Sequence, residues 1–205
     1  MLLWVLCGLV TVNPVIAQNE DVMKQAMEGY KSMQSAKSNV KKTTHLEMLA
    51  QDMVSTGNFY FKKPAKMAII TNNGNDKLIT DGNNFTMVVD GKAVTANGAS
   101  NSAMGPLVDV IKGITSGNTD TDISDVADVD MERQGNLMIM TVTPIVKSAA
   151  ERKKMLYQSF VITIDQKAGQ LKSIRLNGKG KNWEQYDFSN FQLNCPVDDS
   201  VFSVK

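Results

Sequence analysis

The stretch "LITDGNNFTMVVDGKAVTA", residues 78–96, has the pattern of two short strands around a tight turn. Its side chains alternate, so that Phe85, Met87 and Val89 share one face of a strand. Asp90-Gly91 is a dipeptide that two-residue hairpin turns prefer, because both central positions need a positive φ. The apolar face of this hairpin needs a cover, which is either ordinary core or an apolar guest.

Strand patterns separated by turns fill most of the remaining chain. They occur at residues 56–61, 66–71, 128–133, 137–143, 158–165, 171–177 and 182–194, with a short strand at Val201-Phe202. The turn signals and the alternation favour a strongly curved antiparallel sheet or barrel of roughly nine to eleven strands.

Two segments break this pattern with helical spacing. From Asp21 to Met33, apolar residues recur on one stripe, which predicts an amphipathic helix. Residues 104–118 predict a second, shorter helix, or two helical turns broken at Gly113; Pro106 suits the first helical position and Gly117 ends the segment. We expect both helices to lie against the inner face of the curved sheet.

The length and charge of the chain limit the class of protein that it can be. The chain has 205 residues, which fits one domain. Its 22 basic and 21 acidic residues nearly balance, which argues against a nucleic-acid partner. Cofactors are not indicated, because the chain shows no glycine-rich phosphate-binding loop.

The N-terminus "MLLWVLCGLVTVNPVIAQ", residues 1–18, has features of a secretory signal peptide. Its apolar run is too short to span a bilayer, and small residues precede a cleavage point near Ala17-Gln18. The basic residue that normally precedes such a run is missing. We therefore predict a signal peptide at residues 1–17 and one domain at 18–205, and the alternative is a buried N-terminal strand or helix.

The sequence gives little sign of catalysis or metal binding. His45 is the single histidine, and no G-x-S-x-G nucleophile motif is present. Cys195 has no local partner for a Cys-His pair, and aspartates at 120–130 fail the EF-hand spacing. We predict no enzyme, no catalytic residue and no metal site.

Methionine is abundant, with 13 residues, while aromatic residues make up only 6% of the chain. Methionine is flexible and polarizable, so it suits surfaces that adapt to irregular apolar partners. It also fills gaps in ordinary cores, and composition alone does not separate these two roles.

Several stretches of the sequence resemble those of a known protein family. The stretch "GNFYFKKPAKMAIIT" (57–71), followed by "KLITDGNNFTMVV" (77–89), resembles the LolA-type periplasmic lipoprotein carriers. The end of the chain, "SFVITIDQKAGQLKSIRLNGKGKNWEQYDFSNFQLNCPVDDSVFSV" (159–204), is similar to the final strands of that family. Asn194 and Phe202 have the spacing of the family's closing "N…F" pattern.

The resemblance implies an unclosed antiparallel half-barrel whose concave face is lidded by helices and encloses an apolar cavity. We expect the following residues to line this cavity: Met23, Met27, Tyr30, Phe59, Phe61, Met67, Ile69, Phe85, Met87, Val89, Leu107, Val110, Ile111, Ile114, Ile139, Phe160 and Ile162. The family usually has an arginine before the motif's proline, where it holds the lid. Lys63 takes that place here, and it lacks the planar donor fork of arginine.

The implied role is to carry lipoproteins across the periplasm. The partners would be lipoprotein acyl chains, an inner-membrane lipoprotein-releasing transporter and an outer-membrane acceptor, with the carrier itself a monomer. The alternatives are a periplasmic lipid- or protein-sensing module on the same fold, another carrier of hydrophobic ligands, and an enzyme that acts on lipids.

Overall fold

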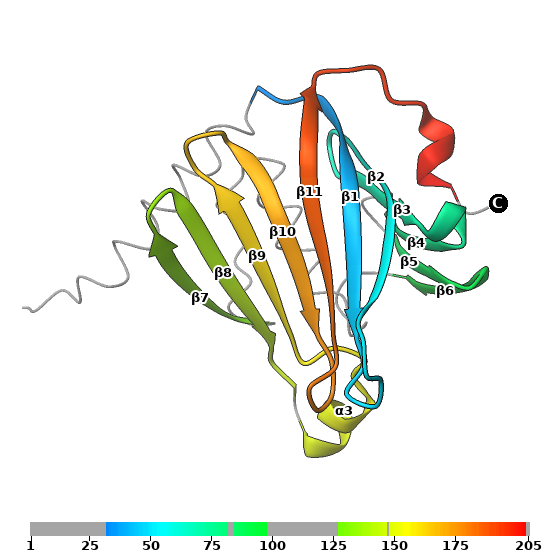
Figure 1. Cartoon of the computed structure of the whole chain (residues 1–205), viewed down its shortest axis with the longest axis vertical. Coiled ribbons are helices and arrows are strands. Elements are labelled where there is room, and N and C mark those ends of the chain that lie inside the picture. Colours follow the sequence, from blue (N-terminus) through cyan, green and yellow to red (C-terminus); the bar gives the residue numbers. More distant parts are fainter. Residues whose placement is uncertain (1–31, 82–83, 98–126, 147, 204–205) are drawn as a thin grey trace, which may run out of the picture.

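The computed structural model describes residues 32–81, 84–97, 127–146 and 148–203. Its main feature is one sheet of eleven strands (Figure 1). They are β1 (Ser35–His45), β2 (Met53–Lys62), β3 (Lys66–Thr71), β4 (Asp76–Thr80), β5 (Asn84–Val89), β6 (Lys92–Asn97), β7 (Ala127–Gln134), β8 (Leu137–Pro144), β9 (Ser159–Asp165), β10 (Gln170–Asn177) and β11 (Trp183–Leu193). Three short helical segments accompany them: η1 (Asn72–Gly74), α3 (Ala149–Lys154) and η3 (Asp199–Phe202).

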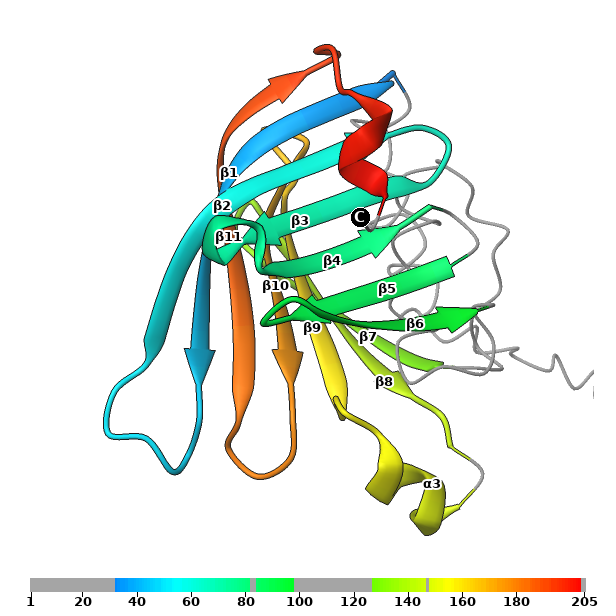
Figure 2. The same cartoon turned by 90° about the vertical axis from the view of Figure 1, so that its right-hand side faces the viewer.

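The sheet is unclosed and antiparallel throughout. Its strand order is β6-β5-β4-β3-β2-β1-β11-β10-β9-β8-β7, so β6 and β7 form the two edges. The first strand, β1, pairs along its length with the last strand, β11, and this pairing joins the two halves of the sheet. The sheet curves strongly between these halves (Figures 1 and 2). The expected half-barrel is therefore confirmed.

Turn chemistry fixes two of the hairpins. Asp90 and Gly91 join β5 to β6 with φ angles of 48° and 76°, as the sequence predicts for a two-residue turn. Gly135 has φ 62° and begins the turn between β7 and β8. Each turn sets the register of its strand pair, and this register decides which side chains share a face.

Gly57 lets β2 and β3 approach closely. A Cβ atom at Gly57 would lie 1.9 Å from the carbonyl oxygen of Ile70, on the neighbouring strand. No side chain fits there, so this position requires glycine.

The C-terminal segment packs on the outer face of the sheet. In η3, Phe202 contacts the small cluster of Ala68 and Ile79 on β3 and β4. Asp199 accepts hydrogen bonds of 2.9 Å from both Lys62 and Lys66. The sequence predicts a strand at Val201-Phe202, and this prediction is wrong. Asp198 instead accepts a hydrogen bond from the Ser200 N–H and begins a helical turn.

The N-terminal part of the prediction also needs correction. The first strand begins at Ser35, whereas the first strand predicted from the sequence lies at residues 56–61. Ser32 and Met33 are described and are not helical, and the rest of the predicted helix at 21–33 lies outside the described residues. The predicted helix at 104–118 lies outside them too, so helices over the concave face are not part of the described fold. No helix in the described ranges has the length and apolar character needed to cross a membrane.

Candidate functional site

One face of the sheet, here called the inner face, is covered with apolar side chains. In the β8–β9 half, the residue pairs Met138–Ile164, Met140–Ile162 and Val142–Phe160 lie directly opposite one another across the two strands. All six side chains are at most 1% exposed. Cross-strand pairs of this kind stabilise a sheet while presenting a continuous hydrocarbon surface.

The β2–β5 half continues this inner face. Phe59 lies opposite Ile69 on β3, and Leu78 lies opposite Met87 in the next strand pair. Phe59 also meets Phe188 of β11 edge to face, with ring centroids 5.1 Å apart. One apolar cluster therefore spans both halves of the sheet.

The structure brings together most of the described candidates for cavity lining. Ten of the candidates fall within the described residues, and eight of these belong to or pack against the inner-face cluster: Phe59, Phe61, Met67, Ile69, Phe85, Met87, Phe160 and Ile162. They share this face because their strands alternate and pair in register.

The placement of Ile139 on this face is wrong. Met138 and Met140 point to the inner face, so Ile139 between them points outward and lies opposite Thr163. Val89 follows the alternation of β5 but is 47% exposed at the end of that strand, so it lies at the margin of the cluster.

The other seven candidates lie outside the described residues. They are Met23, Met27, Tyr30, Leu107, Val110, Ile111 and Ile114.

A polar cluster interrupts the apolar inner face. Lys42 of β1 is only 7% exposed. Its Nζ lies 3.4 Å from a carboxylate oxygen of Asp76 and 3.5 Å from one of Glu184. The Tyr186 hydroxyl donates a 2.8 Å hydrogen bond to Glu184. A buried lysine is tolerated here because two carboxylates compensate its charge.

Two tyrosines beside this cluster are held in their neutral form. Burial raises the pKa of Tyr157 above its usual value, and the nearby negative charge of Glu184 raises it further. Burial and Glu184 raise the pKa of Tyr186 in the same way. Both hydroxyls therefore act as hydrogen-bond donors across the ordinary pH range.

The sequence carries one signal for this polar cluster, which was not predicted. Ser38, Val40 and Lys42 follow each other at every second position of β1, which places Lys42 on the inner face. Glu184 and Tyr186 have the same relation in β11. The spacing could have shown that these side chains face inward, but not that two distant strands bring them together.

One hollow borders the polar cluster, and a second lies on the other side of the sheet. The one beside Lys42, Asp76 and Tyr186 measures about 10 Å³, which is room for about one water molecule. A wider groove of about 580 Å³ lies on the outer face. Its lining includes Asn39, Asn58 and other polar side chains, so it does not suit hydrocarbon.

Other residues singled out in the sequence have structural contacts. Lys63 lies in the β2–β3 turn, where its N–H donates a 2.9 Å hydrogen bond to the Gln34 carbonyl. His45 stacks on Trp183 with ring centroids 5.4 Å apart and hydrogen-bonds Asp52. Cys195 is a free thiol. No group of three or more metal-ligating side chains occurs in the described part of the chain.

The family model described as "Outer membrane lipoprotein carrier protein LolA" matches residues 31–205. The chain belongs to the LolA family. The resemblance seen in the sequence is thereby confirmed, and the inner face of the unclosed sheet is the apolar surface of a LolA fold. No curated protein matches the chain in sequence.

Two solved structures are similar to this chain at low sequence identity. A DUF1329 family protein from Desulfovibrio piger is 12% identical, with a TM-score of 0.50 over 94% of this chain and 98% of that one. A LolA superfamily protein from Nitrosomonas europaea is also 12% identical, with a TM-score of 0.42 over 90% of this chain and 96% of that one.

Proposed function

We propose that this LolA-family chain is a periplasmic carrier that binds lipoprotein acyl chains on its inner face and moves them from the inner to the outer membrane. The observation that carries this proposal is the apolar cluster that spans both halves of an unclosed sheet. The proposed mature chain begins after cleavage near Ala17-Gln18, forms one domain and acts as a monomer.

Energetics define what such a carrier needs. Each methylene taken out of water is worth about 0.8 kcal/mol, so extracting two or three 16-carbon chains from a membrane costs roughly 25 to 35 kcal/mol. Non-covalent affinities saturate near about −18 to −21 kcal/mol. A carrier of this kind therefore depends on an energised transporter for loading, and an acceptor with a higher affinity is enough for unloading.

We propose that the inner face opens to admit a ligand. Pockets for small molecules measure about 300 to 1,000 Å³, whereas the hollow beside Lys42 measures about 10 Å³. We propose that the segments with helical spacing, at 21–33 and 104–118, form the lid that moves. Their apolar stripes support this assignment. Lys63, in place of the family's arginine, would hold this lid with a single point charge.

A release assay with purified protein tests the carrier function. Spheroplasts that export lipoproteins are incubated with the chain, and the lipoprotein released into the supernatant is measured. Met87→Glu places a charge at the inner face, and Ile139→Glu places the same charge on the outer face of another strand. We expect Met87→Glu to lower release at least tenfold and Ile139→Glu to keep it, with circular dichroism showing that both variants are folded.

Two results would argue against this function. Equal release by both variants would remove the inner face from ligand binding. Native mass spectrometry that finds phospholipid bound but never lipoprotein would favour a carrier of another hydrophobic ligand.

A further inference from the structure

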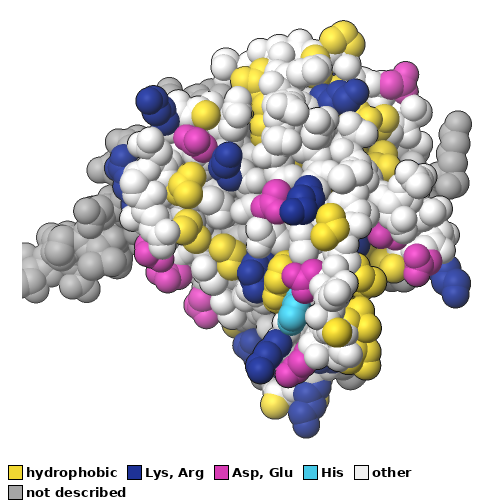
Figure 3. Space-filling view, in the orientation of Figure 1, with side chains coloured by type: hydrophobic (Ala, Val, Ile, Leu, Met, Phe, Trp, Pro, Cys, Tyr) yellow, Lys and Arg dark blue, Asp and Glu magenta, His cyan; other side chains and the backbone are white. Residues whose placement is uncertain are grey.

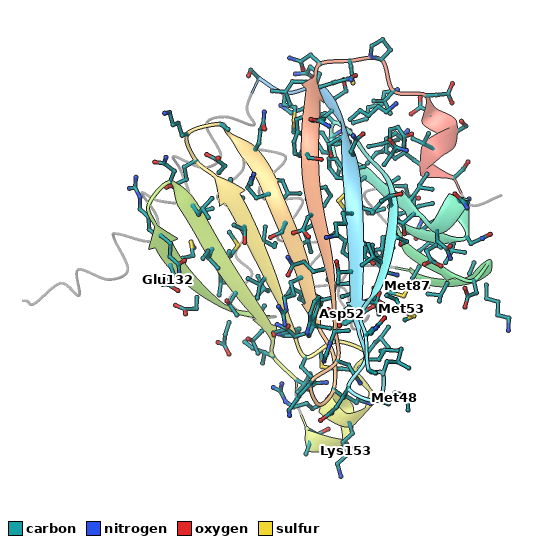
Figure 4. All side chains as sticks on the ribbon, viewed as in Figure 1. Met48, Asp52, Met53, Met87, Glu132 and Lys153 are labelled. Carbon is teal, nitrogen blue, oxygen red and sulfur yellow. The ribbon has the colours of Figure 1, made fainter. Side chains whose placement is uncertain are left out.

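Large apolar side chains are exposed mainly at one end of the molecule. Of the eight such side chains in the described residues, six belong to the β1–β2 turn with the start of β2, or flank α3. We name these six the apolar tip: Met48, Leu49, Met53, Val54, Ile145 and Leu156. Figure 3 shows hydrophobic side chains gathered beside the histidine at this end, and Figure 4 places Met48 and Lys153 there.

The exposure is pronounced for single residues. Met48 is 87% exposed and Val54 is 57% exposed, although both belong to an apolar type that normally turns inward. Scattered exposed residues of this kind need no explanation, but a group at one end indicates an interaction surface.

Contacts between three chain segments hold this end in place. The Glu47 N–H donates a 2.7 Å hydrogen bond to the side chain of Asn182 in the β10–β11 turn. From that turn, Lys179 donates a 2.5 Å hydrogen bond to the Lys153 carbonyl of α3. The tip is therefore part of the ordered fold, and its side chains stay exposed together.

Basic side chains surround the apolar tip. Arg152, Lys153, Lys179 and Lys181 are all exposed at this end. Among the described acidic side chains near this end, Asp52 contacts His45 at 2.7 Å and Glu47 lies 4.0 Å from Lys181. The four basic side chains outnumber these two carboxylates, so the described side chains at this end carry a positive net charge, although the whole chain carries a formal net charge of only +1.

We propose that the apolar tip docks on an anionic phospholipid bilayer, with Met48 and Leu49 entering the interface and the basic side chains contacting lipid phosphates. Stable membrane association takes two contributions, and this end supplies both apolar area and positive charge. A second copy of the chain is a poorer occupant, because a symmetric contact would bring two positive ends together. This proposal is independent of the carrier function.

Vesicle sedimentation tests the docking. The chain is mixed with vesicles of phosphatidylglycerol and phosphatidylcholine at low salt, and the bound fraction gives the partition constant. All variants carry the same N-terminus as the wild type, so that any leader contributes equally. We expect Met48→Ser with Leu49→Ser to weaken binding at least tenfold. Leu193→Ser is the matched control, because Leu193 is 45% exposed at the end of β11, against 42% for Leu49.

Two lysine variants and neutral vesicles test the contribution of charge to docking. Lys153→Gln and Lys181→Gln should each weaken binding to anionic vesicles about fivefold, and pure phosphatidylcholine vesicles should bind the wild type far less. Three results overturn the proposal: a wild type that stays in the supernatant, equal binding by the double serine variant, or light scattering that shows a dimer which this variant dissociates.

Discussion

Replacing Lys42 with methionine tests how the inner face tolerates a buried charge. Methionine keeps much of the apolar stem of lysine but removes the ammonium group between Asp76 and Glu184. The two carboxylates would then lie on the inner face without their common partner. We expect this variant to be folded but clearly less stable than the wild type.

The magnitude follows from burial and distance. Two unit charges about 4 Å apart attract by about 4 kcal/mol at an effective dielectric constant of about 20. Removing one partner of a buried pair costs about 3 to 5 kcal/mol. The Asp76 and Glu184 side chains keep 16% and 23% exposure, so water relieves part of this cost. We therefore expect a loss of about 3 kcal/mol, from a total stability of about 5 to 15 kcal/mol for such domains.

Urea unfolding monitored by circular dichroism measures this loss. Lys41→Met is the matched control, because Lys41 is the exposed neighbour on the same strand, and its replacement should change stability by at most about 0.5 kcal/mol. Adding Asp76→Asn to Lys42→Met should restore part of the loss, since it removes one of the two stranded charges. If Lys42→Met and Lys41→Met unfold at the same urea concentration, the reasoning about the polar cluster is wrong.

Three further predictions concern faces, packing and pH. Met140→Ala should lower the free energy of unfolding by about 2 to 5 kcal/mol, and Ile139→Ala should lower it distinctly less, because the two side chains lie on opposite faces. Equal losses in urea unfolding would contradict the face assignment. Phe202→Ala should cost about 3 kcal/mol by separating η3 from Ala68 and Ile79, and an unchanged midpoint would contradict that docking. Tyr157 and Tyr186 have raised pKa values in the folded chain. Their contribution to the free energy of unfolding is therefore complete below pH about 10. Above that pH the free energy of unfolding falls by about 1.4 kcal/mol per pH unit for each tyrosine. Tyr186→Phe should therefore flatten the alkaline decline of stability, and an unchanged slope would count against this cause.

Local chemistry explains what could be predicted of the fold. The Asp90-Gly91 turn requires positive φ at two neighbouring positions, and few other dipeptides supply it, so the hairpin was visible in the sequence. In the turn between β7 and β8, Gly135 alone supplies a positive φ. Alternation then assigned most inner-face residues of β2, β3, β5 and β9 to one face.

Mixed patterns explain the errors. In β1 the inward positions hold Ala36, Ser38, Val40 and Lys42, so the alternation of apolar and polar residues is too weak to predict a strand. In β8 every inner and outer position from Leu137 to Val142, except Thr141, is apolar, and so Ile139 could not be assigned to a face from its type. Pairing with β9 decides it, and pairing is a property of the folded sheet.

The polar cluster sets a boundary for any hydrocarbon on the inner face. Across the strand pairs, Lys42 lies opposite Tyr186, Tyr186 opposite Ile174, and Ile174 opposite Ile162, so one row of the sheet passes from charged to fully apolar. An acyl chain gains free energy only over the apolar part, because contact with Lys42 would remove water from a charged group. On the carrier proposal, the apolar rows in both halves of the sheet hold the hydrocarbon, and Lys42 faces the polar part of the cargo or water.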